Sequence, residues 1–159
     1  MAFAAEHGAR LRALVVADSL VGLELPLAAR DRMDIAERAT AALSQVERVL
    51  GARARRDHPE RVALYQQIAS FNSVALRTLK GAPRRVTLQG LEDSGLPILF
   101  IVGQDDVLFP PQAVRATHEQ LTHSTYAEIE GAGHSAHFEK PDAFNQVLID
   151  WLDRLALPR

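Results

Sequence analysis

Hydrophobic residues follow two kinds of pattern along this chain. A mainly apolar run at residues 11–17, a continuous apolar run at 97–102 and a weakly alternating run at 125–130 have the length and composition of β-strands. Apolar positions at helical spacing lie between them, and strands joined through helices form parallel sheets with right-handed crossovers. The pattern therefore predicts an α/β fold with about three parallel strands and flanking helices.

The segment between the first two strands, residues 19–93, has a different texture. Helix-forming residues are dense there, and runs of β-branched residues are absent. Apolar positions predict one amphipathic helix over residues 34–50. A second helix is expected to begin around Pro59, which suits a first turn, and to end at Gly81. This segment therefore predicts an all-helical insertion.

The rest of the chain, residues 1–18 and 94–159, alternates strands with helices. Helices are predicted near residues 2–6, 110–121 and 141–155, and the last two carry a clear apolar face. We therefore predict one α/β unit built from two separate segments, with the helical insertion between them.

Composition is that of an ordinary globular protein. With 47% hydrophobic and 24% charged residues, the 159-residue chain can bury a core of its own. A net charge of −2 argues against nucleic acid and anionic membranes as partners. The absence of cysteine excludes disulfides and thiolate metal sites. The apolar runs are too short to cross a bilayer and the first residues lack the basic start of a secretion signal, so we expect a cytoplasmic location.

Two polar side chains stand where parallel sheets usually hold their ligands. Asp106 follows the second predicted strand and His134 follows the third, so both loops would open at the same edge of the sheet. An imidazole can take the proton of a hydroxyl nucleophile when an aspartate holds its far nitrogen. Gly131 and Gly133 would allow the histidine loop a tight turn. The pair therefore predicts acid–base chemistry.

Each of these residues also has a simpler interpretation. An aspartate after a strand is commonly a turn former, and a histidine in a glycine-rich loop is commonly a surface residue. Spacing alone does not choose between Asp105 and Asp106. Asp18, after the first predicted strand, is an alternative acid, although a turn role is more common at such a position.

A nucleophile for this chemistry is missing from the sequence. No Gly-x-Ser-x-Gly turn occurs in it. Ser135 adjoins His134, and adjacent residues rarely direct both side chains at one reacting atom. Ser19 and Ser94 lack the turn altogether. We therefore assign no nucleophile within this chain.

A metal site is the weaker alternative at the histidine loop. His134, His137 and Glu139 lie close in sequence, but no helix is predicted that would set two of them on one face, so we predict no metal. His137 and Phe138 are expected to contact the insertion or to close the last helix. Side chains that could line a pocket rather than the core are Met33, Tyr65, Phe71 and Phe109.

The two segments 96–111 and 129–145 contain, in order, an apolar strand, G-x-x-D, a proline, G-x-G-H and E-x-P. In these motifs the chain resembles the α/β-hydrolase superfamily. The resemblance is specific over residues 94–155 and looser over residues 2–18, which resemble a helix and the strand that follows it in that family.

The resemblance implies a function as well as a fold. Asp106, in the last position of G-x-x-D, would be the acid of a Ser-His-Asp triad, and His134 would be the base. Residues 19–93 would be the cap or lid that shapes the substrate pocket, and no metal or organic cofactor would be required. The expected reaction is cleavage of an ester, a lactone or a C–C bond next to the carbonyl of a small molecule. The insertion is similar in style to those of enol-lactonases and meta-cleavage C–C hydrolases.

The departures from the family pattern also carry expectations. The nucleophile turn and the strands that precede it in the family would lie before Met1. We therefore expect a truncated gene product, a misassigned start, or one segment of a longer or split enzyme, inactive by itself. The strand at 11–17 would then be an open edge, and unpaired backbone groups there favour self-association. The alternative function is a non-catalytic association module that uses this edge and the helical insertion.

Overall fold

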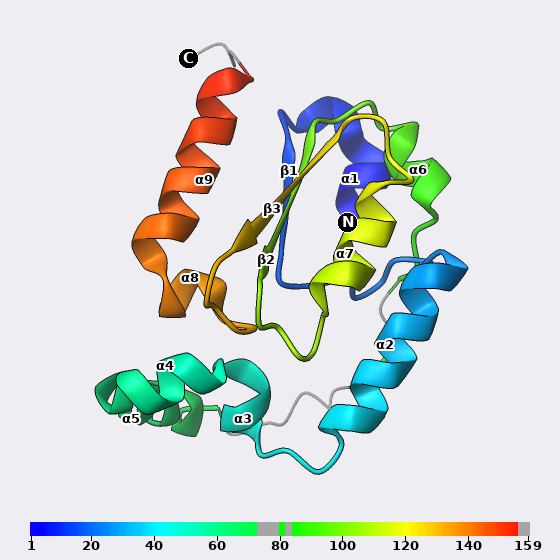
Figure 1. Ribbon diagram of the computed structural model, residues 1–159. Helices are drawn as coiled ribbons and strands as arrows, with labels where there is room; N and C mark the ends of the chain where they lie inside the picture. Colours follow the sequence, from blue (N-terminus) through cyan, green and yellow to red (C-terminus); the bar gives the residue numbers. More distant parts are fainter. Residues whose placement is uncertain (73–79, 82–83, 156–159) are drawn as a thin grey trace.

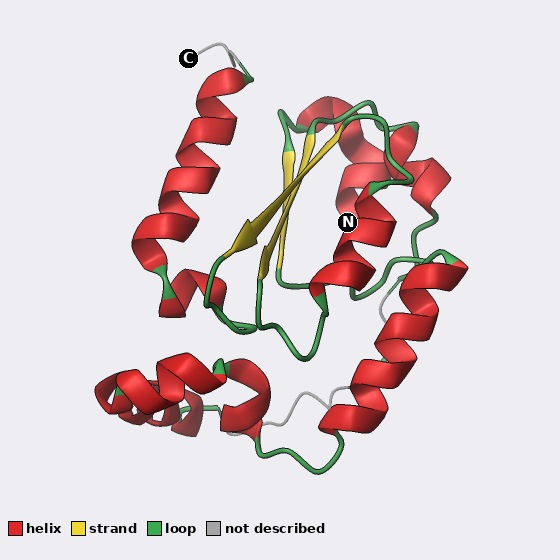
Figure 2. Cartoon of the chain, in the orientation of Figure 1, coloured by secondary structure: helices red, strands yellow, loops and turns green. Residues whose placement is uncertain are grey.

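The computed structural model describes residues 1–72, 80–81 and 84–155. A three-stranded sheet lies at its centre and has the order β1-β2-β3 (Figures 1 and 2). The strands are β1 (Leu14–Ala17), β2 (Ile98–Gly103) and β3 (Ser124–Ile129). Both neighbouring pairs are parallel. The predicted α/β fold with three parallel strands is therefore confirmed.

The first strand is shorter than the sequence predicts. The strand predicted at 11–17 begins only at Leu14, and three residues separate it from a short 3-10 turn, η1 (Gly8–Arg10). Sheet bonding starts where Leu14 N–H donates to Pro97 O at 2.9 Å. Since β2 begins one residue after Pro97, no partner strand is available for the residues before Leu14. The other two strands begin and end within one residue of their predicted bounds.

The central strand separates two apolar layers. All six residues of β2 are buried, with Ile98, Phe100 and Val102 in one hydrophobic cluster and Leu99 and Ile101 in another. Helices α1 (Ala2–His7), α6 (Leu88–Glu92) and α7 (Pro111–His118) contribute to the first cluster, and α9 (Pro141–Arg154) contributes to the second (Figure 1). A continuous apolar run is therefore the natural sequence of this strand, because both of its faces are covered.

The single helix predicted over residues 34–50 is wrong. Two helices occupy this region, α2 (Leu27–Thr40) and α3 (Gln45–Val49). Ser44 explains the break: it accepts a hydrogen bond from Glu47 N–H, and the Glu47 side chain bonds back to Ser44 N–H, which forms a capping box. Apolar spacing continues across this break, so the periodicity alone conceals it.

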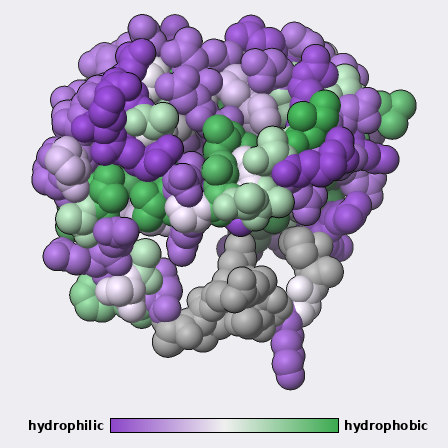
Figure 3. Space-filling model, turned by 60° about the horizontal axis from the view of Figure 1, so that its bottom comes forward, coloured by the Kyte–Doolittle hydropathy of each residue, from purple (hydrophilic) through white to green (hydrophobic). Residues whose placement is uncertain are grey.

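The remaining helices of the insertion are α4 (Ala52–Asp57) and α5 (Pro59–Ser70). Proline opens α5 as predicted, whereas much of the predicted continuation toward Gly81 lies at residues 73–79, outside the described residues. Helices α3–α5 lie beyond the carboxyl ends of the strands (Figure 1). Figure 3, which turns this side toward the viewer, shows hydrophobic side chains in the middle of a largely hydrophilic face.

Both ends of the insertion join the main core. Leu20, Leu23 and Val86 belong to the same hydrophobic cluster as the helices on the first face of the sheet. Leu23 also pairs with Val86 in an isolated parallel bridge. The assignment of residues 19–93 to a separate cap remains a prediction, and its ends are anchored in the α/β unit.

Candidate active site at the carboxyl ends of the strands

The turn after β2 buries and orients the carboxylate of Asp106. Its side chain is 0% exposed. Its Oδ1 atom accepts hydrogen bonds from Leu108 N–H at 2.8 Å and from Phe109 N–H at 2.9 Å. These two bonds occupy one oxygen and fix the plane of the carboxylate. The other oxygen, Oδ2, is left to face the loop that follows β3.

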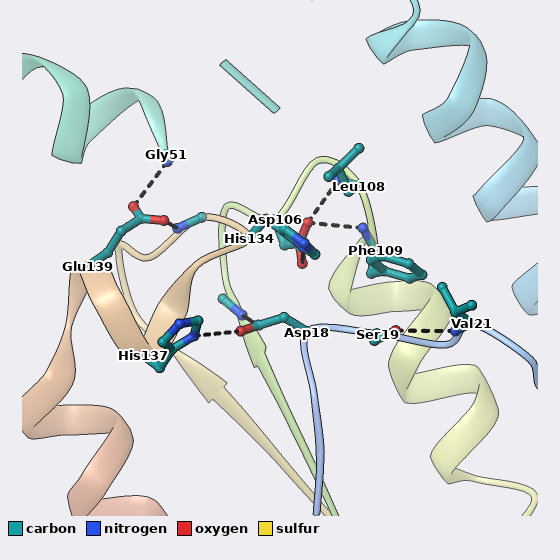
Figure 4. Close-up of polar contacts among 12 residues, drawn as sticks. Asp18, Ser19, Val21, Gly51, Asp106, Leu108, Phe109, His134, His137 and Glu139 are labelled. Atoms are coloured by element: carbon teal, nitrogen blue, oxygen red, sulfur yellow. Dashed lines mark hydrogen bonds and ion pairs between the residues drawn. The ribbon is translucent and has the colours of Figure 1, made fainter. Parts of the chain in front are cut away.

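That loop carries His134 against the buried aspartate. His134 Nδ1 lies 3.0 Å from Asp106 Oδ2 (Figure 4). Because an ionised carboxylate can only accept, this contact requires the proton on Nδ1 and leaves Nε2 as the basic nitrogen. The Phe109 ring stacks on the imidazole, with ring centroids 5.6 Å apart and planes inclined by 23°. The sequence-predicted pair is thus brought into hydrogen-bond contact.

Glycines let the histidine loop close onto the end of β2. Gly131 has a φ of +64°, in the left-handed region that glycine adopts without steric cost. A Cβ atom on Gly103 would lie 2.0 Å from Gly133 O and 2.5 Å from Ala132 O. Only glycine therefore fits at the end of β2, where the two backbones touch. This close approach sets the distance between the two loops.

The surroundings of His134 favour its protonated form. Burial of the ring would by itself lower its pKa. The hydrogen bond from the ring to Asp106, together with the negative charges of Asp106, Asp18 and Glu139, outweighs that effect, so the pKa of His134 is raised above 6.5. The site therefore stabilises an imidazolium, the state that a general base reaches after it takes a proton.

Asp18 holds a second carboxylate at the same edge of the sheet. It directly follows β1 and adopts a left-handed φ of +48°. Its Oδ1 accepts from Gly103 N–H at 3.2 Å, whereas Oδ2 is buried without a hydrogen-bond partner among the described residues. His137 Nδ1 lies 4.0 Å from that oxygen, too far for a hydrogen bond. Burial, together with the charge of Asp106, raises the pKa of Asp18 to about 7.

The structure distinguishes among the three aspartates that the sequence left as candidates for the acid. Asp106 contacts the imidazole, and Asp18 is directed at Gly103 and toward His137 instead. Asp105 is exposed, and its backbone N–H donates to Ala132 O at 2.8 Å. Of the three, Asp106 alone has the geometry of an acid that orients His134.

No hydroxyl group within the described ranges forms a hydrogen bond with His134. Ser19 accepts from Val21 N–H, and the hydroxyl of Ser94 donates to Leu91 O. Ser135 is buried, and its N–H donates to Val49 O at 3.0 Å. These contacts are local or structural, and they give none of the serines the role of a nucleophile.

The sequence did not reveal the role of Glu139, which was considered as a metal ligand and as part of the E-x-P motif. Both of its carboxylate oxygens accept backbone N–H groups, from Gly133 at 3.1 Å and from Gly51 at 3.0 Å. These bonds direct the carboxylate away from a shared point with His134 and His137. Among the described residues, no group of three or more acidic or imidazole side chains is close enough to hold a metal ion. The E-x-P motif was the only signal of this residue in the sequence.

A cavity of about 200 Å³ lies between α3, α4 and the histidine loop. Its lining includes Leu43, Arg48, Leu50, Arg55, Val107 and His134. Of the aromatic and methionine side chains predicted to line a pocket, Met33 and Tyr65 line two other cavities, Phe109 stacks on His134, and Phe71 is 85% exposed.

Comparisons with known proteins agree on the fold. A family model described as the alpha/beta hydrolase fold matches residues 2–141. A Mycobacterium tuberculosis protein provisionally named a non-heme bromoperoxidase, BpoC, is 30% identical over 158 residues, which cover 86% of this chain and 60% of the relative. The chain thus spans about three fifths of that relative's length.

Two solved structures show the same arrangement of elements. A thermophilic esterase from Thermogutta terrifontis is 24% identical, with a TM-score of 0.66 over 97% of this chain and 60% of the esterase. Est816, described as an N-acyl homoserine lactone degrading enzyme, is 19% identical, with a TM-score of 0.66 over 93% of this chain and 61% of that enzyme. At these identities the likeness extends to the fold alone. Across the parts of the chain that the structure describes, no helix combines the length and apolar character needed to cross a membrane.

The raised pKa of Asp18 predicts how stability depends on pH. An unfolded aspartate titrates near 3.8, so between that value and about 7 the folded chain binds more protons at Asp18 than the unfolded chain does. The free energy of unfolding should therefore fall as pH rises through this window. Asp18→Asn removes this loss, at most about 4 kcal/mol, and asparagine tolerates the left-handed backbone.

Urea unfolding at about pH 4.5 and about pH 8 measures this effect. The wild-type chain should lose more stability between the two conditions than Asp18→Asn does. Asp31→Asn, at an exposed position on α2, is the control and should keep the wild-type difference. Equal pH dependence in the wild type and Asp18→Asn would contradict the account of Asp18.

Proposed function

Because this chain belongs to the α/β-hydrolase family, we propose that Asp106 and His134 are the acid and the base of a serine-type hydrolase. The observation that carries the proposal is the 3.0 Å contact between His134 Nδ1 and the buried Asp106 Oδ2. The two N–H bonds to Oδ1 are those of a turn-forming aspartate, but a turn role would not bury the carboxylate with its other oxygen against an imidazole. A surface histidine would not be stacked against Phe109. These contacts support an acid–base pair rather than a turn-forming aspartate and an unrelated surface histidine.

The pair has defined roles in acyl transfer. His134 Nε2 removes the proton of a hydroxyl nucleophile as its oxygen bonds to the carbonyl carbon of the substrate. Asp106 keeps the imidazole in the Nδ1–H tautomer and stabilises the imidazolium that forms. His134 then returns the proton to the leaving group as the bond to it breaks. In the second half of the cycle, His134 deprotonates a water whose oxygen bonds to the acyl carbon. It then returns that proton to the oxygen of the nucleophile as the acyl bond breaks, which releases the carboxylic acid.

The nucleophile in this proposal lies outside the chain described here. The sequence has no Gly-x-Ser-x-Gly turn, and the chain spans about 60% of the length of its relatives. The chain alone should therefore be inactive.

The substrate class is proposed from the proteins of similar structure. They include an esterase and an enzyme that degrades a lactone, which supports an ester or lactone of a small molecule as the substrate. A C–C bond next to a carbonyl is an alternative within the same chemistry. The mechanism needs no metal or organic cofactor.

A chimera tests this function. The segment of BpoC that precedes its match to this chain is joined to Met1, and hydrolysis of p-nitrophenyl acetate is measured. The chimera should hydrolyse the ester, whereas the chain alone should give the same background rate with or without His134→Ala. In the chimera, His134→Ala and Asp106→Asn should each lower kcat/KM by roughly a thousandfold or more, because the base or its tautomer is lost.

Asp31→Asn is the matched control and should leave the rate of the chimera unchanged, since Asp31 is exposed on α2 and is not part of the cavity that His134 lines. Far-UV circular dichroism and a cooperative melt establish that each variant folds. A folded chimera that keeps its activity after His134→Ala would contradict the proposed role of the pair.

A second function, self-association, is favoured by the edge of the sheet. Among the described strands, β1 pairs with β2 alone, and Val15 on β1 is 36% exposed. An unprotected edge of a parallel sheet offers backbone donors and acceptors to another chain. The alternative to a hydrolase segment is therefore an association module that pairs through β1.

Sedimentation velocity over a range of concentrations tests the edge. The wild-type chain should sediment faster as its concentration rises, and Val15→Lys should remain monomeric because a charge on the edge opposes strand pairing. Ile149→Lys, on the exposed side of α9, is the control. A wild-type chain that stays monomeric at every concentration would rule out pairing through β1.

A further inference from the structure

One buried carboxylate near the site has no part in the proton transfer. Glu139, at the end of α8 (Ala136–Glu139), is 1% exposed. A carboxylate buried to this degree is costly unless each oxygen finds a donor. The Glu139 carboxylate has two hydrogen-bond donors, and they come from segments far apart in the sequence. The inference that follows rests on the proposed function, because it concerns the placement of the base.

The two oxygens of Glu139 bridge the helical insertion and the histidine loop. Oε1 accepts from Gly133 N–H at 3.1 Å, one residue before His134. Oε2 accepts from Gly51 N–H at 3.0 Å, at the junction between α3 and α4 (Figure 4). One side chain thus holds two backbone segments that face each other across the site.

At Gly133 the backbones meet too closely for a side chain, and at Gly51 they leave little room for one. A Cβ atom on Gly133 would lie 2.3 Å from Gly51 N and 3.0 Å from Glu139 Oε1. A Cβ atom on Gly51 would lie 3.0 Å from both Glu139 Oε2 and Gly133 N. The two glycines and the carboxylate therefore form one tightly fitted unit.

Further bonds hold the same contact on the other side of His134. Ser135 N–H donates to Val49 O at 3.0 Å. The guanidinium of Arg61, on α5, donates to the backbone oxygen of Glu139. Ser135, after His134, is therefore bonded directly to α3, and Gly133, before His134, is linked to the α3–α4 junction through Glu139. The loop has little freedom to turn the imidazole away from Asp106.

We propose that Glu139 is a positioning residue, which fastens the α3–α4 junction to the histidine loop and thereby holds His134 against Asp106. The position of the helical insertion and the orientation of the His134 ring are then coupled through the carboxylate of Glu139. The charge of Glu139 also contributes to the raised pKa of His134, so its loss should be felt at the imidazole. The loss of this charge shifts the pKa whether or not the ring moves, so amide exchange in the two bridged segments must be measured beside it.

Glu139→Gln tests the proposal in the chain as it stands. The substitution keeps the shape of the side chain but replaces one acceptor with an NH₂ group, which cannot accept from an N–H. The pKa of His134, measured by NMR titration of its ring, should fall, because a negative charge near the imidazole is lost. Backbone amides of Gly51, Gly133 and Ser135 should exchange with solvent roughly tenfold faster, because one bond to a charged group is lost.

Glu60→Gln, an exposed change on α5, is the control and should leave both readouts as in the wild type. A folded Glu139→Gln variant in which either the pKa of His134 or the exchange of these amides is unchanged would overturn the proposal, even if it melts at a lower temperature. If Glu139→Gln does not fold, Gly51→Ala replaces it, since it leaves the carboxylate in place but pushes the junction away.

Gly51→Ala should likewise speed amide exchange at Gly133 and Ser135 and shift the His134 ring resonances, and unchanged values would overturn the proposal. These measurements need no nucleophile, so the two proposals can fail separately. Unchanged values here would contradict the role of Glu139 but not the proposed hydrolase function. An inactive chimera would contradict the proposed function, and the role of Glu139 as a positioning residue would still be tested by these measurements.

Discussion

The structure of the site depends on the contact between His134 Nδ1 and Asp106 Oδ2. The Asp106 carboxylate is buried, and each of its oxygens has a hydrogen-bond donor. Two backbone N–H groups bind one oxygen, and the imidazole faces the other. Burial would make an unpaired charge costly here, so the turn after β2 and the loop after β3 must both hold their positions. The parallel sheet supplies that condition, because its strands end at one edge, and Gly103 lets the two loops touch.

Helices α3–α5 stand beyond that edge, and their junction at Gly51 reaches the histidine loop through Glu139. The base is therefore held from two directions, by Asp106 from the turn after β2 and by Glu139 through the backbone of its own loop. Asp18 adds a third carboxylate, whose buried oxygen lacks a hydrogen-bond partner. Three acids near one histidine account for the direction of its pKa shift.

The sequence predicts what depends on local pattern. The apolar run of β2 indicates a strand covered on both faces, and all six of its residues are buried. The break before Ser44 is missed because a capping box interrupts a helix without interrupting its apolar spacing. The partners of Glu139 are missed for another reason: Gly51 lies 88 residues away, and no local signal specifies a long-range hydrogen bond. Likewise, the choice between Asp105 and Asp106 depends on which side chain turns inward, which spacing does not encode.

The most direct test of the central contact is the titration and tautomer of His134 in the wild type and in Asp106→Asn, followed by NMR of the ¹⁵N-labelled ring. The account predicts an Nδ1–H tautomer and a pKa above 6.5 in the wild type. In the variant, the amide NH₂ group can donate to Nδ1, so the pKa should fall below that of the wild type and the ring should shift to the Nε2–H tautomer. An unchanged pKa and tautomer in Asp106→Asn would mean that the two side chains are not hydrogen-bonded in solution, and would contradict the account.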